Sequence, residues 1–303
     1  MFKIISDGGC DFSAAEAEKH GVEVIPFYIM PDADTYLREG TDITKEEYFK
    51  RLAAEKNFFP KTAQPNPQDY IDAYTPYLRA GKDILSLTIS SKLSGSFNSA
   101  TLAAQMLAEE FPERRIVVVD SLNASIGQGL ILREIIRMRD AGFNLKETTR
   151  TAREVLKTTR VYFTLDTLEY LKKGGRIGST TAFVGGILGL RPILQLENGE
   201  VSQLDNVRGR KNAYRLIEGA ITHALAGETE KINICVGHIS SAEDAENFKA
   251  NISAALNLEI KTPVTEVGAA IGTHAGPGAL AFAYCRKYEN ICAGGIEKLR
   301  EAA

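Results

Sequence analysis

The chain has 303 residues, of which 44% are hydrophobic and 25% are charged, values that are typical of a globular protein with room for two domains. Its formal net charge of −3 excludes a general attraction to nucleic acid or to an anionic membrane, so any basic patch is local. The four cysteines lack metal-ligand spacing, the chain opens directly on a strand pattern, and the apolar runs are shorter than the ~18 residues that span a bilayer. We therefore expect a cytoplasmic protein without a metal site or a cofactor.

The first half alternates between buried strands and helices. Strands are predicted at residues 2–5, 22–30, 83–89 and 116–119. Ser13, Thr44 and Asn66 have the composition and spacing of helix caps, and further helices are predicted at 97–110 and 127–141. Apolar strands separated by helices favour a parallel sheet that is covered on both faces.

A hydroxyl-rich turn, residues 90–96, follows the third of these strands. Ligands of open α/β sheets bind at the carboxyl ends of the strands, and the backbone N–H groups that open a helix attract an anion. The turn therefore predicts an anion site at Ser94 and Gly95. The alternative is that Ser94 only caps the next helix. A nucleophilic serine is disfavoured, because no G-x-S-x-G elbow surrounds it.

The second half has a different pattern. A strand at 161–165, a short helix at 166–171 and a basic turn at 172–176 come first. Asn198-Gly199 between alternating runs is typical of a β-hairpin. Helices at 212–226 and 242–255 and strands at 232–237 and 264–267 complete a mixed α+β pattern, and the glycines at 185–189 are explained best by close helix packing. We predict two domains, residues 1–160 with a parallel sheet and residues 161–303 with a mixed sheet.

A glycine-rich segment, residues 268–279, contains His274. Glycines at this density allow the backbone to approach a ligand, and a histidine among them is able to donate to a carboxylate or phosphate. The segment is not a dinucleotide fingerprint, because its strand–turn–helix context is missing.

Four motifs occur in a recognisable order, namely Ser91-x-x-Ser94-Gly95, Asp120-Ser121, Leu171-Lys172-Lys173-Gly174-Gly175-Arg176-Ile177 and Gly272-x-His274-x-Gly276-Pro277-Gly278-Ala279. On these motifs the chain resembles the DegV family of bacterial fatty-acid-binding proteins, from Lys3 to about Tyr284. The resemblance implies a carrier and not an enzyme. It implies two domains that enclose one long-chain fatty acid at their interface, and a separate fatty acid kinase that phosphorylates the carboxylate for phospholipid synthesis.

Site residues follow from the resemblance. It implies that Thr62 of the Lys-Thr-x-Gln-Pro loop, Ser94, Gly95, His274 and Arg176 surround the carboxylate. The sequence departs from the family at residue 8, where Asp7-Gly8-Gly9-Cys10-Asp11 replaces the usual Asp-Ser-x-x-Asp.

Two interpretations of the basic turns and three of the function stay open. The basic turns predict a docking face for the kinase, formed by Lys172, Lys173, Arg208, Arg210 and Lys211, and the alternative is ordinary solvated charge. For the function, the alternatives to a carrier are an enzyme that uses the same Ser/His site on a small carboxylic or phosphorylated substrate, and a sensor of lipid occupancy.

Overall fold

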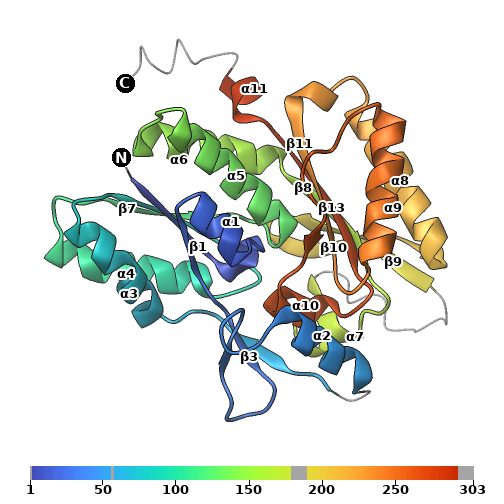
Figure 1. Ribbon diagram of the computed structural model, residues 1–303, viewed down its shortest axis with the longest axis horizontal. Helices are drawn as coiled ribbons and strands as arrows, with labels where there is room; N and C mark the ends of the chain where they lie inside the picture. Colours follow the sequence, from blue (N-terminus) through green and yellow to red (C-terminus); the bar gives the residue numbers. More distant parts are fainter. Residues whose placement is uncertain (1, 56–57, 179–189, 293–303) are drawn as a thin grey trace.

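The computed structural model describes residues 2–55, 58–178 and 190–292. Within them the strands form a four-stranded parallel sheet, a six-stranded mixed sheet and a small three-stranded sheet (Figure 1). The predicted fold class, a parallel α/β layer followed by a mixed sheet, is confirmed. The division into domains at residue 160 stays a prediction.

The parallel sheet is built from the first half of the chain. Its order is β2–β1–β6–β7, with the strands at Val22–Ile25, Lys3–Asp7, Ile84–Thr88 and Ile116–Asp120. Helices α3 (Pro67–Arg79) and α4 (Ser96–Glu110) cover one face, and α5 (Ile126–Asp140) and α6 (Leu145–Thr158) cover the other (Figure 1). The short α1 (Ala14–Lys19) begins at Ser13, which caps it as predicted.

The mixed sheet comes from the second half, with the order β10–β9–β8–β13–β11–β12. Its strands lie at Glu200–Arg208, Leu190–Glu197, Arg160–Thr164, Leu280–Arg286, Ile232–His238 and Thr265–Glu266, and only β11 and β12 pair in parallel. Helices α8 (Arg210–Leu225) and α9 (Ala242–Leu256) cover one face. The hairpin predicted at Asn198-Gly199 is confirmed between β9 and β10.

Helix α5 lies between the two large sheets. Its apolar side chains share one core with residues of β1, β6 and β7 and also with residues of β8, β11 and β13. A helix in that position is covered over most of its surface, which explains why most of its residues are buried, and its exposed charges, Arg137 and Asp140, lie near its end. The two sheets are therefore joined through a common helix.

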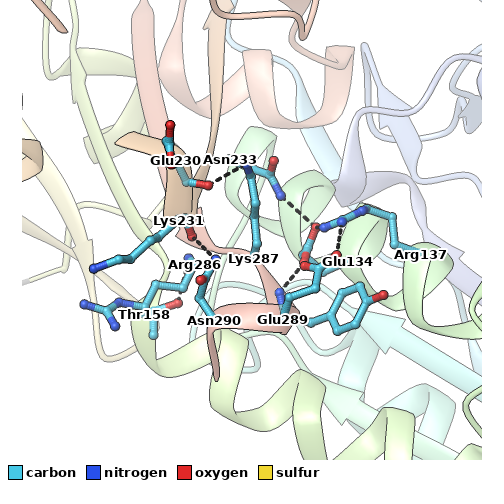
Figure 2. A network of polar contacts seen from close by, with 11 residues as sticks. Glu134, Arg137, Thr158, Glu230, Lys231, Asn233, Arg286, Lys287, Glu289 and Asn290 are labelled. Carbon is cyan, nitrogen blue, oxygen red and sulfur yellow. Dashed lines mark hydrogen bonds and ion pairs between the residues drawn. The ribbon is translucent and has the colours of Figure 1, made fainter. Parts of the chain in front are cut away.

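A buried carboxylate fixes α5 to the end of the chain that the structure describes (Figure 2). The Glu134 side chain is fully buried, and it accepts hydrogen bonds from Arg137, from Asn233 of β11 and from the backbone N–H of Tyr288, each at 2.6–2.7 Å. Tyr288 begins α11 (Tyr288–Cys292). Burial raises the pKa of Glu134, and the hydrogen bonds from Arg137 and from the Tyr288 N–H act in the opposite direction, so the charge is tolerated only because it is hydrogen-bonded.

The small sheet corrects one strand prediction. Residues 22–30 form two strands in different sheets, β2 and β3 (Tyr28–Met30), and not the single strand that was predicted. Pro26 lies between them, and a proline has no N–H with which to continue a ladder. The antiparallel order is β4–β3–β5, with β4 at Leu37–Arg38 and β5 at Lys61–Ala63.

Helices beside the small sheet connect it to the second half. Helix α2 (Lys45–Ala54) has the capping box predicted at Thr44, and it packs on α10 (Ala269–Ala275). The Tyr48 hydroxyl lies 2.6 Å from the Thr273 hydroxyl, and both residues are buried. The sheet thus covers the place where the two halves meet.

In three places the structure differs from the elements predicted from the sequence. Helix α6 was not predicted, although Asn144 and Glu147 form a capping box at its start. The glycine-rich segment begins with α10, where no helix was predicted. A short helix was predicted at 166–171, and α7 occupies Glu169–Lys173 instead. The glycines at 185–189 lie outside the described residues.

Candidate functional site

A cavity lies between the parallel and the mixed sheet, and we call it the interface cavity. It encloses about 950 Å³ of space free of protein atoms, including its opening to solvent. Most of its wall is apolar and comes from both halves, with Phe27, Ile89, Ala124, Phe163, Leu165, Leu196, Val201, Val267, Ala270 and Ala279 among the lining residues. The polar groups on the wall are few, and they include Thr62, Gln64, Ser94, Ser125, Arg176, His238 and His274. An apolar cavity with a few polar groups suits an amphipathic ligand.

The hydroxyl-rich turn lies at the carboxyl end of β6, as predicted. Helix α4 starts from Gly95 and has no side-chain cap. The Ser94 hydroxyl is 3.3 Å from the Ser96 N–H and 3.3 Å from the Ser96 hydroxyl, which are long contacts for hydrogen bonds. Ser94 is therefore a poor cap, and its hydroxyl is available to the cavity.

The hairpin of the second half closes over this turn. The Ser90 hydroxyl donates a 2.7 Å hydrogen bond to the carbonyl of Gly199, at the tip of the hairpin between β9 and β10. A Cβ on Gly199 would lie 2.6 Å from the same hydroxyl oxygen, so a larger residue has no room there. The φ of Gly199 is +87°, which also favours glycine.

Thr62 and His274 meet across the cavity wall. The Thr62 hydroxyl, on β5, lies 2.8 Å from His274 Nε2, on α10. Burial and the nearby Arg176 guanidinium lower the pKa of His274 to about 4, so the imidazole is neutral near pH 7.

The tautomer of His274 follows from what surrounds its two nitrogens. Nδ1 is buried and has no hydrogen-bond partner in the described part of the chain, and a Cβ on Gly174 would lie 2.0 Å from it. Nδ1 is left without a partner in either tautomer, and an orphaned buried N–H is rarer in proteins than an orphaned acceptor, which favours the proton on Nε2. Nε2–H then donates to the Thr62 oxygen, and the Thr62 hydroxyl hydrogen is free to donate to a ligand.

Arg176 brings a positive charge to the same wall. Its Nε donates to the carbonyl of Leu93 at 3.0 Å, and its Nη1 donates to the carbonyl of Gly174 at 2.7 Å. These bonds connect the basic turn to the hydroxyl-rich turn. No carboxylate of the described residues pairs with Arg176, and burial lowers its pKa from the ordinary value. A bound anion would supply the missing counter-charge.

Gln64 is a cavity residue that the sequence interpretation used only as part of a motif. A Cβ on Gly95 would lie 2.7 Å from Gln64 Nε2, so the loop after β5 lies directly over the start of α4. The sequence signal for Gln64 was the Lys-Thr-x-Gln-Pro motif. Gln64 follows Thr62 by two positions, and both side chains line the same wall of the cavity.

The glycines near His274 serve protein packing. A Cβ on Gly272 would lie 2.3 Å from the Phe49 ring, and a Cβ on Gly276 would lie 2.3 Å from the Tyr170 ring. The expectation that these two glycines admit a ligand is corrected, because protein side chains occupy that space. His274 is placed on the cavity by the short helix α10.

A buried carboxylate supports the strand that leads into the site. Asp7, at the end of β1, accepts hydrogen bonds from the Ile89 N–H at 2.9 Å, from the Gly9 N–H at 3.1 Å and from Gln128 Nε2 at 2.9 Å. Burial raises the pKa of Asp7 to about 6, although these donors act in the opposite direction. Asp7 thus ties the carboxyl ends of two parallel strands to α5.

The residues predicted for docking differ in their surroundings. Lys172, Lys173, Arg208 and Lys211 are exposed. Arg210 instead makes ion pairs with Asp166 at 2.7 Å and with Asp244 at 2.9 Å. The pair with Asp166 fastens the start of α8 to the segment that leads into α7, so the two basic turns belong to connected parts of the structure. Because these ion pairs hold the Arg210 guanidinium within the protein, it is less available to a docking partner than the four exposed cations.

The described residues contain no cluster of three or more His, Cys, Asp or Glu side chains that is arranged to hold a metal ion. Within the same ranges, no helix is both long and apolar enough to cross a membrane.

Comparison with known sequences gives one family. Residues 1–287 match the sequence model of the DegV family, whose members are described as uncharacterised. A DegV domain-containing protein of Caldanaerobacter subterraneus is 33% identical over 279 residues, which cover 91% of this chain and 95% of that protein. A second DegV domain-containing protein, from Clostridium perfringens, is 29% identical and covers 94% of this chain and 99% of its own length.

Solved structures show the same fold. A stearic-acid-binding protein from Eubacterium ventriosum superposes with a TM-score of 0.91 at 29% identity, covering 96% of this chain and all of that one (100%). A DegV family protein from Thermus thermophilus, described by its fatty acid binding, gives a TM-score of 0.85 at 32% identity, covering 94% of this chain and 99% of its own.

Proposed function

The chain belongs to the DegV family, and we propose that it binds one long-chain fatty acid in the interface cavity and presents the carboxylate to a partner fatty acid kinase. The observation that carries the proposal is the composition of the cavity wall: it is apolar over most of its area, and hydroxyl, imidazole and guanidinium groups come together at one part of it. Related structures that bind fatty acids support it.

The energetics of the wall agree with an acyl ligand. Each methylene that leaves water contributes about 0.8 kcal/mol, so a long acyl chain contributes on the order of 10 kcal/mol before the costs of binding. A buried carboxylate needs hydrogen bonds or a counter-charge. Thr62 and Ser94 provide hydroxyl donors, and Arg176 provides the charge.

In this proposal His274 orients Thr62 and is not a catalytic base. Its Nε2–H holds the Thr62 oxygen at 2.8 Å, which leaves the threonine hydrogen for the ligand. A carboxylate in the cavity would favour the imidazolium and raise the pKa of His274. The chain itself supplies positioning, and the phosphoryl transfer belongs to the kinase.

The test is mass spectrometry of the protein after expression and denaturation. We expect one long-chain fatty acid per chain, and ATP-dependent acyl-phosphate formation when a fatty acid kinase is added. A stoichiometric small carboxylic or phosphorylated compound in place of a fatty acid would favour the enzyme alternative. A bound fatty acid that the kinase does not phosphorylate would refute the presentation step and favour a sensor.

A further inference from the structure

Strand β7 is an edge strand of the parallel sheet, and its outer edge is unpaired. Among the described residues it pairs only with β6. The Ile84 N–H donates to Arg115 and the Ser121 N–H donates to Thr88, at 2.8 and 3.0 Å. In a parallel ladder these two bonds direct the backbone groups of residues 117 and 119 toward β6. The N–H and C=O groups of Ile116, Val118 and Asp120 therefore point outward.

These outward groups face a groove, which we call the edge groove. It has about 1470 Å³ of open space and lies between α4 and α6, with the tip of the β9–β10 hairpin at one end. Its wall includes Phe97, Val118, Leu122 and Leu156, so the groove is partly apolar. Leu122 is 42% exposed, which is high for a leucine in a groove. Figure 1 shows α4 and α6 on opposite sides of β7.

One wall of the edge groove is basic, because Arg153, Lys157 and Arg160 line it, and two further cations on α6 continue their row beyond the groove. Lys146, Arg150, Arg153, Lys157 and Arg160 follow one another at intervals of four and three residues, which places them along one face of α6 and its end. We call them the basic row, and all five are exposed. The side chains of Lys146, Arg150 and Arg153 make no ion pair or hydrogen bond with any described residue. At 1.5 Å per residue, the helical part of the row from Lys146 to Lys157 is about 17 Å long, the length of about five extended residues.

The two carboxylates in the edge groove are already used locally. Asp120 accepts hydrogen bonds from the backbone N–H groups of Ser91 and Leu122, at 3.2 and 2.9 Å. Glu197 accepts hydrogen bonds from side chains of its own hairpin, Gln195 and Ser202, at 3.3 and 3.2 Å. They therefore do not neutralise Lys146, Arg150 or Arg153, whereas Lys157 is paired within α6 with Glu154 at 2.7 Å.

We propose that the edge groove binds an acidic segment of another protein, which adds to β7 as an extended strand and places its carboxylates against the basic row. Main-chain hydrogen bonds to Ile116, Val118 and Asp120 would supply affinity, and the cations would supply selectivity for an acidic sequence. Strand β7 is apolar and carries no charged residue before Asp120. An exposed edge strand of this kind pairs nonspecifically with other chains unless a specific partner covers it.

A second copy of the chain is a poorer occupant. Antiparallel pairing of two β7 strands about a two-fold axis would place both α6 helices on the same face of the joined sheet. The two basic rows would then lie side by side, and their like charges would repel one another. Charge complementarity therefore selects an acidic partner.

The experiment uses a labelled peptide of alternating glutamate and threonine, (Glu-Thr)₄, with the complete chain and fluorescence anisotropy at low salt. We expect saturable binding, slower hydrogen exchange in residues 116–120, and no binding of (Lys-Thr)₄. The double variant Arg153→Glu/Lys157→Glu should bind at least tenfold more weakly. The matched double variant Lys249→Glu/Lys261→Glu changes the net charge equally elsewhere and should bind as the wild type does.

A peptide with N-methyl groups on alternate residues separates strand addition from simple charge attraction. It keeps every carboxylate and loses the hydrogen bonds along one edge, so it should bind at least tenfold more weakly. Equal binding of both peptides would overturn the proposal, and so would equal binding by wild type and the α6 variant. A dimer that protects residues 116–120 without peptide, or binding to anionic vesicles but not to the peptide, would also overturn it. Fatty acid content, measured in parallel, should stay unchanged in both variants.

Discussion

The Thr62 hydroxyl lies 2.8 Å from His274 Nε2, although 212 residues separate the two in the chain. Thr62 reaches the cavity on the small antiparallel sheet, and His274 reaches it on a helix that follows the mixed sheet. The pair therefore forms only when the two halves of the chain are in place. Four of the five residues predicted around the carboxylate line the same cavity, and Gly95 lies next to it.

The first prediction concerns His274. His274→Gln keeps a donor of similar reach toward Thr62 and removes proton transfer. We expect this variant to bind fatty acid and to support acyl-phosphate formation close to the wild-type level. Thr62→Val removes the hydroxyl and should weaken binding about tenfold or more, because a hydrogen bond to a charged group contributes about 1.5–3 kcal/mol. The measurements are displacement of a fluorescent fatty acid and kinase turnover.

Thr62→Ser, which keeps the hydroxyl, is the control and should bind almost normally. Normal binding by His274→Gln with loss of turnover would give the histidine a chemical role and contradict the carrier-only function.

The second prediction concerns Ser94. Ser94→Ala should lower fatty acid affinity more than tenfold and leave the fold intact, because its hydroxyl makes only long contacts within the protein. The same displacement assay measures it. Ser91→Ala removes an exposed hydroxyl of the same turn, outside the cavity wall, and should have no effect. Equal affinity of the two variants would exclude Ser94 from the site.

The third prediction concerns the basic turns. The double variants Lys172→Glu/Lys173→Glu and Arg208→Glu/Lys211→Glu should each slow acyl-phosphate formation severalfold at low salt and weaken its salt dependence, because exposed charges steer association. Fatty acid content should not change. Lys249→Glu/Lys261→Glu is the charge-matched control. Wild-type rates in both test variants would make these turns ordinary solvated surface.

The fourth prediction concerns Asp7 and pH. Burial raises the pKa of Asp7 to about 6 in the folded chain, above its usual value of about 3.9 when unfolded. The folded state therefore binds the proton more tightly, and this group stabilises folding as the pH falls from 6 to 4. Relative to Asp7→Asn, the wild type should gain on the order of 2 kcal/mol over that window. Urea unfolding at a series of pH values measures the difference.

Asp34→Asn, at an exposed carboxyl, is the control and should follow the wild-type curve. Parallel curves for the wild type and Asp7→Asn would contradict the raised pKa.

The fifth prediction concerns the contact between α5 and the end of the described chain. Glu134→Ala leaves Arg137, Asn233 and the Tyr288 N–H without their acceptor, and it should destabilise the protein by about 3–5 kcal/mol. Glu289→Ala removes a half-exposed partner of Arg137 and should cost less than about 1 kcal/mol. Urea denaturation at neutral pH compares them. Equal stability of the two variants would show that the buried carboxylate is not the anchor.

Local signals in the sequence determined much of the fold. Thr44 and Asn66 cap helices because a side-chain oxygen and a carboxylate three residues later satisfy the free N–H groups of a first turn. Asn198-Gly199 closes a hairpin because both residues have positive φ. The apolar runs of β1, β6 and β7 indicated a buried parallel sheet. The caps and the hairpin turn form within a few residues of their signals, so the sequence alone is sufficient for them.

The family resemblance carried by four motifs also predicted which residues belong to the site. The surroundings and the protonation of these residues depend on the tertiary structure. Composition does not indicate that Gly272 and Gly276 receive Phe49 and Tyr170, that Arg210 is paired with Asp166, or that Val22–Met30 divides between two sheets. The low pKa of His274 depends on burial by segments from both halves and on Arg176 nearby. Desolvation and packing are sums over neighbours that are distant in sequence, and only the folded chain determines which neighbours those are.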